Sequence, residues 1–250
     1  KKVMNSFFSK KGESVLGIDI GSSSIKLVQL KKKGGKAVLE TYGEISLGPY
    51  AGFEIGRSTN LNSDKISESL KDLISEANVT THSCGVSIPI SSSLITFIKL
   101  PQTAEKQLQT VIPMEARKYI PVPISEVSLN WWVVPEERDA LSEFKSGEGE
   151  NQDQDINVFL AVIHNDAIER DTKIVKALFL ESSFFEIELF SSIRSSLDQS
   201  LQPQMVFDMG ASSTKLYIVE RGIVRNSHVI NRGSQDITMS ASKSMGISFE

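Results

Sequence analysis

The sequence DIGSSSIKL at residues 19–27 returns in a close copy, DMGASSTKL, at residues 208–216. In both copies an aspartate follows a short apolar run, a glycine comes two residues later, and small residues lead into a second apolar run. Two apolar runs joined by a short Gly/Ser segment are typical of a β-hairpin. The repeat therefore predicts two hairpins of one design, far apart in the chain.

The segments around the first copy predict a three-stranded antiparallel meander. Its strands are residues 15–20, 25–30 and 37–46, with turns at 21–24 and at KKKGGK, 31–36. Apolar residues at helical spacing behind Ser63 and Asp64 predict a helix, and Cys84 begins a fourth strand that ends at Ile88. The order βββαβ has one economical solution, in which the fourth strand pairs in parallel through a helical crossover. The prediction is a ribonuclease H-like half-domain.

Residues 89–181 predict a small inserted α+β block. Its strands are expected at 93–100, 127–134 and 156–163, and its helices at 104–119 and 166–180. Pro113 should kink or break the first of these helices. Strand alternation places one ring of Trp131-Trp132 inward and the other outward. Eight acidic residues against two basic ones between Glu136 and Asp155 predict a solvated loop.

The end of the chain predicts a return to the opening design. Residues 182–202 contain a strand-like FFEIE and a helix, and residues 203–250 begin a second half-domain with the second hairpin. The chain begins without methionine and stops at GISFE, in what reads as the start of a new element. We expect a fragment.

Composition bounds the class of protein. The 250 residues are 40% hydrophobic and 23% charged, which fits a globular chain of one or two domains. The net charge of −4 sits largely in the acidic run, so no nucleic-acid surface is expected. The single Cys84 excludes an internal disulfide, favours a reducing compartment, and reads as a small buried residue. Because no window approaches the roughly 20 apolar residues of a bilayer span, we expect a cytosolic protein.

The repeated phrase has a specific chemical use. A turn of small residues lets a phosphate approach the backbone amides, and a carboxylate at the strand end can bind Mg²⁺ through waters. One such turn alone reads more readily as a plain β-turn, but the pair favours a polyphosphate clamp. Lys26 and Lys215 could contact phosphate or lie on the wet face of a strand, and we leave them out of the predicted site. The predicted metal residues are Asp19 and Asp208, and the predicted phosphate-binding residues are Gly21, Ser22, Ser23, Ser24, Gly210, Ala211, Ser212, Ser213 and Thr214.

The two motifs resemble the phosphate motifs of the actin-like ATPase superfamily, which includes chaperones, sugar kinases and FtsA. The segments VLGIDIGSSSIKLVQL (15–30), EARKYIPVPISEVSLNWWVV (115–134) and NRGSQDIT (231–238) are similar more specifically to PilM, a family of cytoplasmic type IV pilus assembly proteins. The resemblance implies ATP and Mg²⁺ as ligands. It also matches Glu188, in FEIELF, to the acidic residue that orients a water for hydrolysis. Leu189 and Phe190 depart from the small residues that usually follow.

The resemblance names the parts of the chain as well. It implies subdomain 1A at 1–88 and 182–202, subdomain 1C at 89–181, and the start of subdomain 2A at 203–250, with the adenosine-binding glycine motif after residue 250. It implies a scaffold that binds the N-terminal tail of a PilN-like inner-membrane protein, works beside other pilus assembly proteins, and hydrolyses ATP slowly at most. Through that partner it would lie at the inner face of the cytoplasmic membrane without a span of its own. Self-association is left open.

Two alternatives remain at this point. A small-molecule kinase of the same superfamily would need a carboxylate base near a substrate hydroxyl, and none is evident in subdomain 1A. An FtsA-like cell-division protein would carry a C-terminal amphipathic membrane helix, which would lie past residue 250.

Overall fold

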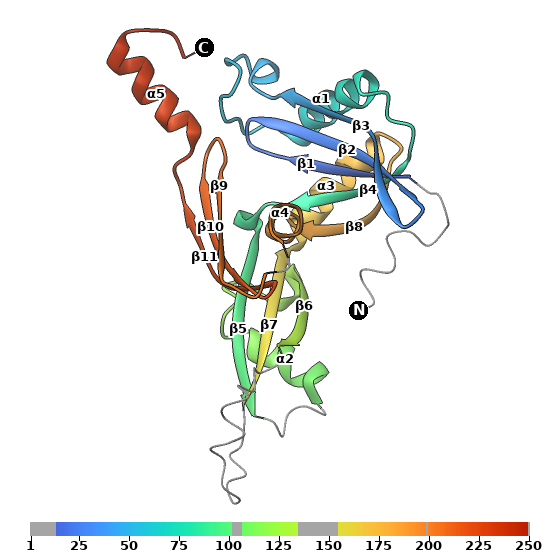
Figure 1. The fold of residues 1–250 in the computed structure, drawn as a ribbon, viewed down its shortest axis with the longest axis vertical. Coiled ribbons are helices and arrows are strands. Elements are labelled where there is room, and N and C mark those ends of the chain that lie inside the picture. The colour runs from blue at the N-terminus through green and yellow to red at the C-terminus, as the bar shows by residue number, and fades with distance from the viewer. Residues whose placement is uncertain (1–13, 102–106, 135–154, 199, 250) are drawn as a thin grey trace, which may run out of the picture. The chain divides into compact units, whose positions relative to one another are not determined.

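A computed structural model describes residues 14–101, 107–134, 155–198 and 200–249. The chain forms two compact units, shown with their helices and strands in Figure 1. The first unit comprises Lys1–Pro89 and Glu169–Glu250, and the second comprises Ile90–Ile168. Each unit has its own sheet and core, so each is described separately.

The first unit contains the predicted half-domain. Its five strands are β1 (Ser14–Ile20), β2 (Ser24–Lys33), β3 (Lys36–Ser46), β4 (Ser83–Ile88) and β8 (Glu181–Ile187). They lie in the order β3-β2-β1-β4-β8. The β1–β2 and β2–β3 pairs are antiparallel, and the β1–β4 and β4–β8 pairs are parallel. The meander and the parallel crossover are therefore confirmed.

Helices α1 (Ser63–Glu76) and α3 (Asn165–Ala177) share one core with this sheet. The side chain of Asn62 caps α1 by accepting a hydrogen bond from the Lys65 amide at 3.0 Å. Apolar residues of both helices, among them Leu70 and Ile174, are fully buried in the same core as Leu16 of β1. Cys84 is buried in the same core, as expected for a small apolar side chain.

The first unit also contains the second copy of the hairpin. Strands β9 (Gln204–Met209), β10 (Thr214–Glu220) and β11 (Ile223–Ile230) form an antiparallel sheet in the order β11-β10-β9. Helix α4 (Glu188–Ser196) follows β8, and α5 (Ser234–Met245) follows β11. The register pairs Asp208 with Lys215, just as Asp19 pairs with Lys26 in the first copy. The sequence repeat is thus also a repeat of strand register.

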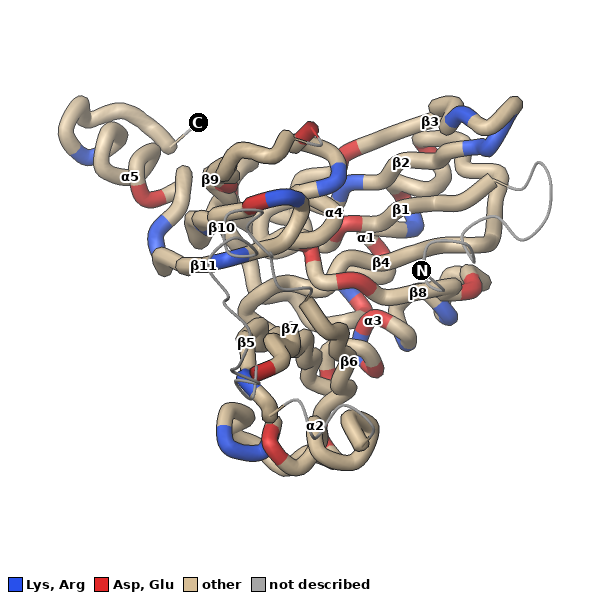
Figure 2. The backbone as a smooth tube through the Cα atoms, turned by 60° about the horizontal axis from the view of Figure 1, so that its bottom comes forward, with Lys and Arg blue, Asp and Glu red and all other residues tan. Residues whose placement is uncertain are grey.

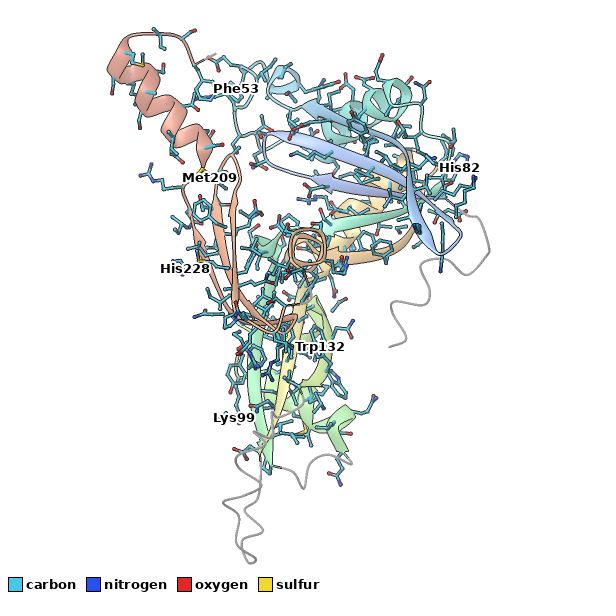
Figure 3. The ribbon with its side chains drawn as sticks, in the orientation of Figure 1. Phe53, His82, Lys99, Trp132, Met209 and His228 are labelled. Atoms are coloured by element: carbon cyan, nitrogen blue, oxygen red, sulfur yellow. The ribbon has the colours of Figure 1, made fainter. Side chains whose placement is uncertain are left out.

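The second unit is built on the sheet β5-β7-β6, whose strands are β5 (Ser93–Pro101), β6 (Val127–Val134) and β7 (Asp155–His164). Helix α2 (Leu108–Ala116) packs on one face and contains Pro113 without ending there. Trp131 packs against that core, whereas Trp132, labelled in Figure 3, is 41% exposed and stacks on Phe159 with 4.4 Å between ring centroids. The inward and outward placement of the two rings is confirmed.

The second unit ends at Ile168, earlier than the insertion expected at 89–181. Ile174, Val175 and Leu180 belong to the core of the first unit, and β8 joins its sheet from Glu181 onward. The expected start of the helix at Ala104 and most of the acidic run, 135–154, lie outside the described residues. Among the helices that the structure does describe, none is long and apolar enough to cross a membrane.

Candidate functional site

The two repeated turns have the same backbone hydrogen bond. The amide of Gly21 donates to the carbonyl of Ser24 at 3.0 Å, and the amide of Gly210 donates to the carbonyl of Ser213 at 2.9 Å. A Cβ atom on Gly21 would lie only 2.9 Å from the Ser24 oxygen, and one on Gly210 would lie 3.1 Å from the Ser213 oxygen. Both positions therefore favour glycine because the backbone approaches itself closely there.

Carbonyl groups of both turns accept hydrogen bonds from backbone amides outside the turns. In the first turn, the carbonyl of Ser22 accepts from the Thr59 amide and the carbonyl of Ser23 accepts from the Leu47 amide, both at 2.8 Å. In the second turn the first residues of α5 donate instead, and the carbonyls that accept lie one position earlier. There the carbonyls of Gly210 and Ala211 accept from the amides of Ser234 and Gln235, at 2.9 and 3.2 Å.

The amides of the same turns are left available. Five of them donate to no acceptor among the described residues, namely those of Ser22, Ser23, Ala211, Ser212 and Ser213. Backbone amides gathered on a turn of small residues form a concave site for an anion. The two turns also touch, because the hydroxyl of Ser212 donates to the hydroxyl of Ser22 at 3.1 Å. The structure thus brings the two predicted phosphate motifs together.

Two of the predicted phosphate-binding side chains have structural partners instead. Ser24 and Thr214 are the first residues of β2 and β10, and both are buried. The hydroxyl of Ser24 accepts from Lys26 Nζ at 3.0 Å, and that of Thr214 donates to the Arg232 carbonyl at 2.8 Å. These side chains close the turns, so the open amides carry the anion-binding character.

Gly233 also belongs to the site. It lies within NRGSQDIT and is not among the predicted phosphate-binding residues. It precedes α5 and packs on the second turn so closely that a Cβ atom would lie 2.3 Å from the Ala211 oxygen. Its amide donates a hydrogen bond to the Asp236 carboxylate at 2.9 Å. Gly233 therefore lets the first residues of α5 reach the carbonyls of the turn.

Asp19 lies at the end of β1, where its Oδ1 atom accepts a hydrogen bond from the Ser87 hydroxyl of β4 at 2.5 Å. Lys26 is paired with it in register but turns toward solvent. The Lys26 side chain is 54% exposed and its Nζ atom lies 3.4 Å from Glu44 of β3. In the first copy, no ion pair therefore joins the aspartate to a cationic side chain among the described residues.

The second copy differs, because Lys215 points inward. Its Nζ atom donates to Glu188 Oε2 at 2.6 Å and lies 3.5 Å from Asp208 Oδ2, and its side chain is only 13% exposed. Glu188 is the first residue of α4, directly after β8, and so lies on a strand-to-helix turn. Lys215 was left out of the predicted site, although its register opposite Asp208 is a signal that could have included it.

The electrostatics of this cluster follow from burial and charge. Burial alone would lower the pKa of Lys215, but the hydrogen bond and charge of Glu188, with a contribution from Asp208, outweigh it and raise the pKa. Two residues further along β10, burial raises the pKa of Tyr217, and the charges of Glu188 and Asp208 raise it further. The Tyr217 hydroxyl is buried and has no hydrogen-bond partner among the described residues.

The donor set suits Mg²⁺ better than a transition metal. The described residues contain no group of three or more His, Cys, Asp and Glu side chains that could hold a metal ion. Mg²⁺ keeps several waters and commonly takes only one or two carboxylates together with phosphate oxygens. Asp19 fits that role, whereas Asp208 already shares Lys215 with Glu188.

The strand order of the five-stranded sheet and the two paired turns place this chain in the class of proteins with an actin-like ATPase fold. Residues 17–250 match the family model of the type IV pilus assembly protein PilM. The chain therefore belongs to the PilM family.

Three solved structures show the same fold at low sequence identity. A PilM–PilN type IV pilus biogenesis complex matches with a TM-score of 0.72 and 20% identity, covering 94% of this chain and 66% of that one. The cytoplasmic domain of EpsL, an inner-membrane component of the type II secretion system of Vibrio cholerae, matches with a TM-score of 0.54 and 10% identity, over 92% and 75% of the chains. The ethanolamine utilization protein EutJ of Carboxydothermus hydrogenoformans matches with a TM-score of 0.52 and 11% identity, over 97% and 60%. The present chain thus spans just under two thirds of the matched chain of the pilus complex.

Proposed function

We propose that this chain is an ATP-binding scaffold protein of type IV pilus assembly. The observation that carries the proposal is the meeting of two turns whose carbonyls are engaged and whose amides are available. The phosphates of ATP would lie against the five available amides, those of Ser22, Ser23, Ala211, Ser212 and Ser213. Asp19, and to a lesser extent Asp208, would hold Mg²⁺ through water, and the ion would neutralise the charge of the phosphates.

The surroundings of Glu188 support binding rather than rapid turnover. A carboxylate that orients or deprotonates a water must have an oxygen available for it. Lys215 donates to Glu188 Oε2 at 2.6 Å in a largely buried position, so that oxygen already has a charged hydrogen-bond donor. We therefore propose that hydrolysis is slow at most. A kinase, whose output is phosphoryl transfer, is disfavoured for the same reason.

The partner we propose is the N-terminal cytoplasmic tail of a PilN-like inner-membrane protein. Family membership supports this partner, as does the fold match to PilM in a complex with PilN. We assign the five-stranded sheet to subdomain 1A, the second unit to 1C and the sheet β11-β10-β9 to 2A. Through the tail the protein would lie at the inner face of the cytoplasmic membrane, beside other pilus assembly proteins.

The surface of 1C offers a place for such a tail. Helix α2 is followed by a segment that contains Pro121 and Pro123. Met114, within α2, and Tyr119, between α2 and Pro121, are both exposed. An extended tail that orders on binding can use exposed apolar anchors of this kind. In the full-length protein, Tyr119→Ala should weaken binding of a PilN-like tail peptide several-fold, measured by fluorescence anisotropy. Unchanged binding, with no NMR shift changes in residues 107–134, would remove this surface from the proposal.

The nucleotide proposal is tested by titrating ATP into the full-length protein by calorimetry, with and without Mg²⁺. Asp19→Ala should lower the ATP affinity mainly when Mg²⁺ is present, and Asp208→Ala should lower it less. Neither change leaves a large void, so the fold should survive. Glu76→Ala, which removes an exposed carboxylate at the end of α1, is the matched control. Equal ATP affinity in Asp19→Ala and in the control, at every Mg²⁺ concentration, would overturn the proposal.

A further inference from the structure

Among the described residues, the hairpin of β2 and β3 extends beyond the pairing of β1 with β2. Pairing of β1 with β2 begins at Ser14 and Lys31, whereas pairing of β2 with β3 continues outward to Lys33 and Lys36. The turn between them is Gly34-Gly35, with φ angles of 58° and 80°. Figure 2 shows the end of this hairpin in the colour of basic residues. Four of its six residues from 31 to 36 are lysines, and we call this segment the basic tip.

The charges of Lys33 and Lys36 do not stabilise the hairpin itself. Lys33 and Lys36 lie directly opposite each other, an arrangement that destabilises a strand pair when the charges are alike. Lys31, on the same face, lies 3.6 Å from Glu40, but no ion pair joins Lys33 or Lys36 to any described acidic residue. The chain as a whole is acidic, with a net charge of −4. The local excess of positive charge therefore points to an anionic partner outside the chain.

Apolar side chains accompany the lysines. Val38 is 41% exposed on the face of Lys31 and Lys33, and Leu39 is 55% exposed on the other face. Lysines with apolar neighbours suit a lipid interface, because the long stems lie along the acyl boundary while the ammonium groups reach the headgroups. Single-stranded nucleic acid is a poorer match, since residues 31–39 contain no aromatic or arginine side chain on which bases could stack.

We propose that the basic tip contacts the anionic headgroups of a membrane surface. The inference rests on the proposed position of the protein beside a membrane, but it concerns a surface separate from the ATP turns. A basic residue near an anionic leaflet contributes about 1 kcal/mol, equivalent to about a fivefold gain in binding. Lys33 and Lys36 together therefore give weak, salt-sensitive binding. Such contact orients a protein that a membrane partner has already brought to the surface.

The test is co-sedimentation of the full-length protein with vesicles, without any tail peptide. Vesicles of phosphatidylcholine alone are compared with vesicles that also contain phosphatidylglycerol. The double variant Lys33→Gln/Lys36→Gln should bind the anionic vesicles about 25-fold more weakly than the unmodified protein, at fivefold per lysine. The matched control is Lys65→Gln/Lys71→Gln, which makes the same change in net charge at two exposed positions of α1.

The outcomes separate this inference from the proposed function. Support requires selective loss of anionic vesicle binding in the tip variant, a normal thermal midpoint, and unchanged affinities for ATP and for the tail peptide. The inference is overturned if the unmodified protein does not prefer anionic vesicles, or if the α1 control loses as much binding as the tip variant. Equally tight binding of a single-stranded RNA through the tip, at the same salt concentration, would also overturn it. None of these results would change the ATP or tail-peptide titrations.

Discussion

Replacing Lys215 with methionine tests whether the buried cluster beside the second turn matters energetically. Methionine preserves most of the apolar stem but removes the ammonium group. Glu188 would lose its 2.6 Å donor and Asp208 its cation at 3.5 Å. Two carboxylates would then face each other without the charge between them, in a site where their side chains are 17% and 34% exposed.

The expected cost lies between two limits. Breaking a fully buried ion pair by removing one partner costs about 3–5 kcal/mol, whereas an exposed pair contributes about 0–1 kcal/mol. Because the Lys215 cluster is largely but not fully buried, we expect Lys215→Met to lower the free energy of unfolding by about 2 kcal/mol at neutral pH. For a domain of this size, that corresponds to a fall of several degrees in the thermal midpoint.

The pH dependence gives a sharper signature. The pKa of Lys215 is raised in the folded protein, so its contribution is fully present below the unfolded-state pKa of about 10.4 and is lost as pH rises through the folded value. The difference between the two proteins should therefore be present at neutral pH and shrink as pH rises through the folded value of Lys215.

The repeat supplies the control for this experiment. Lys26 is the equivalent residue of the first hairpin, but it is 54% exposed and lies 3.4 Å from Glu44. Urea denaturation of Lys26→Met should show a loss of about 0–1 kcal/mol with little pH dependence. If Lys215→Met is no more destabilising than Lys26→Met across the pH range, the reasoning about the buried cluster is wrong.

Three further outcomes follow from single residues of the first unit. Gly233→Ala should lower both stability and ATP affinity, because its Cβ would lie 2.3 Å from the Ala211 oxygen. In the control Gly17→Ala the new Cβ meets only the Val28 oxygen, at 3.8 Å, so neither quantity should fall. Calorimetry of both variants checks this. Glu188→Ala should leave ATP binding and pilus assembly intact while removing any residual hydrolysis, and loss of assembly in a folded, ATP-bound variant would favour the kinase instead. Burial raises the pKa of Cys84 to about 11, so a thiol reagent at neutral pH should label it only after denaturation, and rapid labelling of the native protein would show that the core of the first sheet opens.

Much of the fold could be predicted because its signals are local. Alternating apolar runs around a glycine turn identify each hairpin, and the helical spacing behind Ser63 identifies α1. The limit of the insertion could not be read in this way. An amphipathic pattern shows that α3 has an apolar face, but it does not show which core that face joins, and Ile174 packs with the first sheet. The predicted boundary at 181 therefore lies beyond the observed one at Ile168.

The site shows the same division between local and distant information. The turn residues were predictable because a few consecutive residues determine both their conformation and their spacing. The direction of each lysine depends instead on what lies across from its strand. Glu44 of β3 lies beside Lys26, whereas Glu188, from a helix distant in sequence, lies beside Lys215. A sequence alone does not show that two residues in equivalent positions of a repeat have different neighbours.

That difference bears on what the two halves of the site can do. In the first half, Asp19 receives a hydroxyl from Ser87 and is placed to accept a cation. In the second half, the ammonium group of Lys215 already lies between Asp208 and Glu188, the residue expected to orient a water. A fixed internal cation reduces the need for a metal there, and it also contacts one oxygen of the Glu188 carboxylate. The amides of the second turn remain available for phosphate all the same. The asymmetry of the two copies thus favours a protein that binds nucleotide and releases it unchanged over one that turns it over quickly.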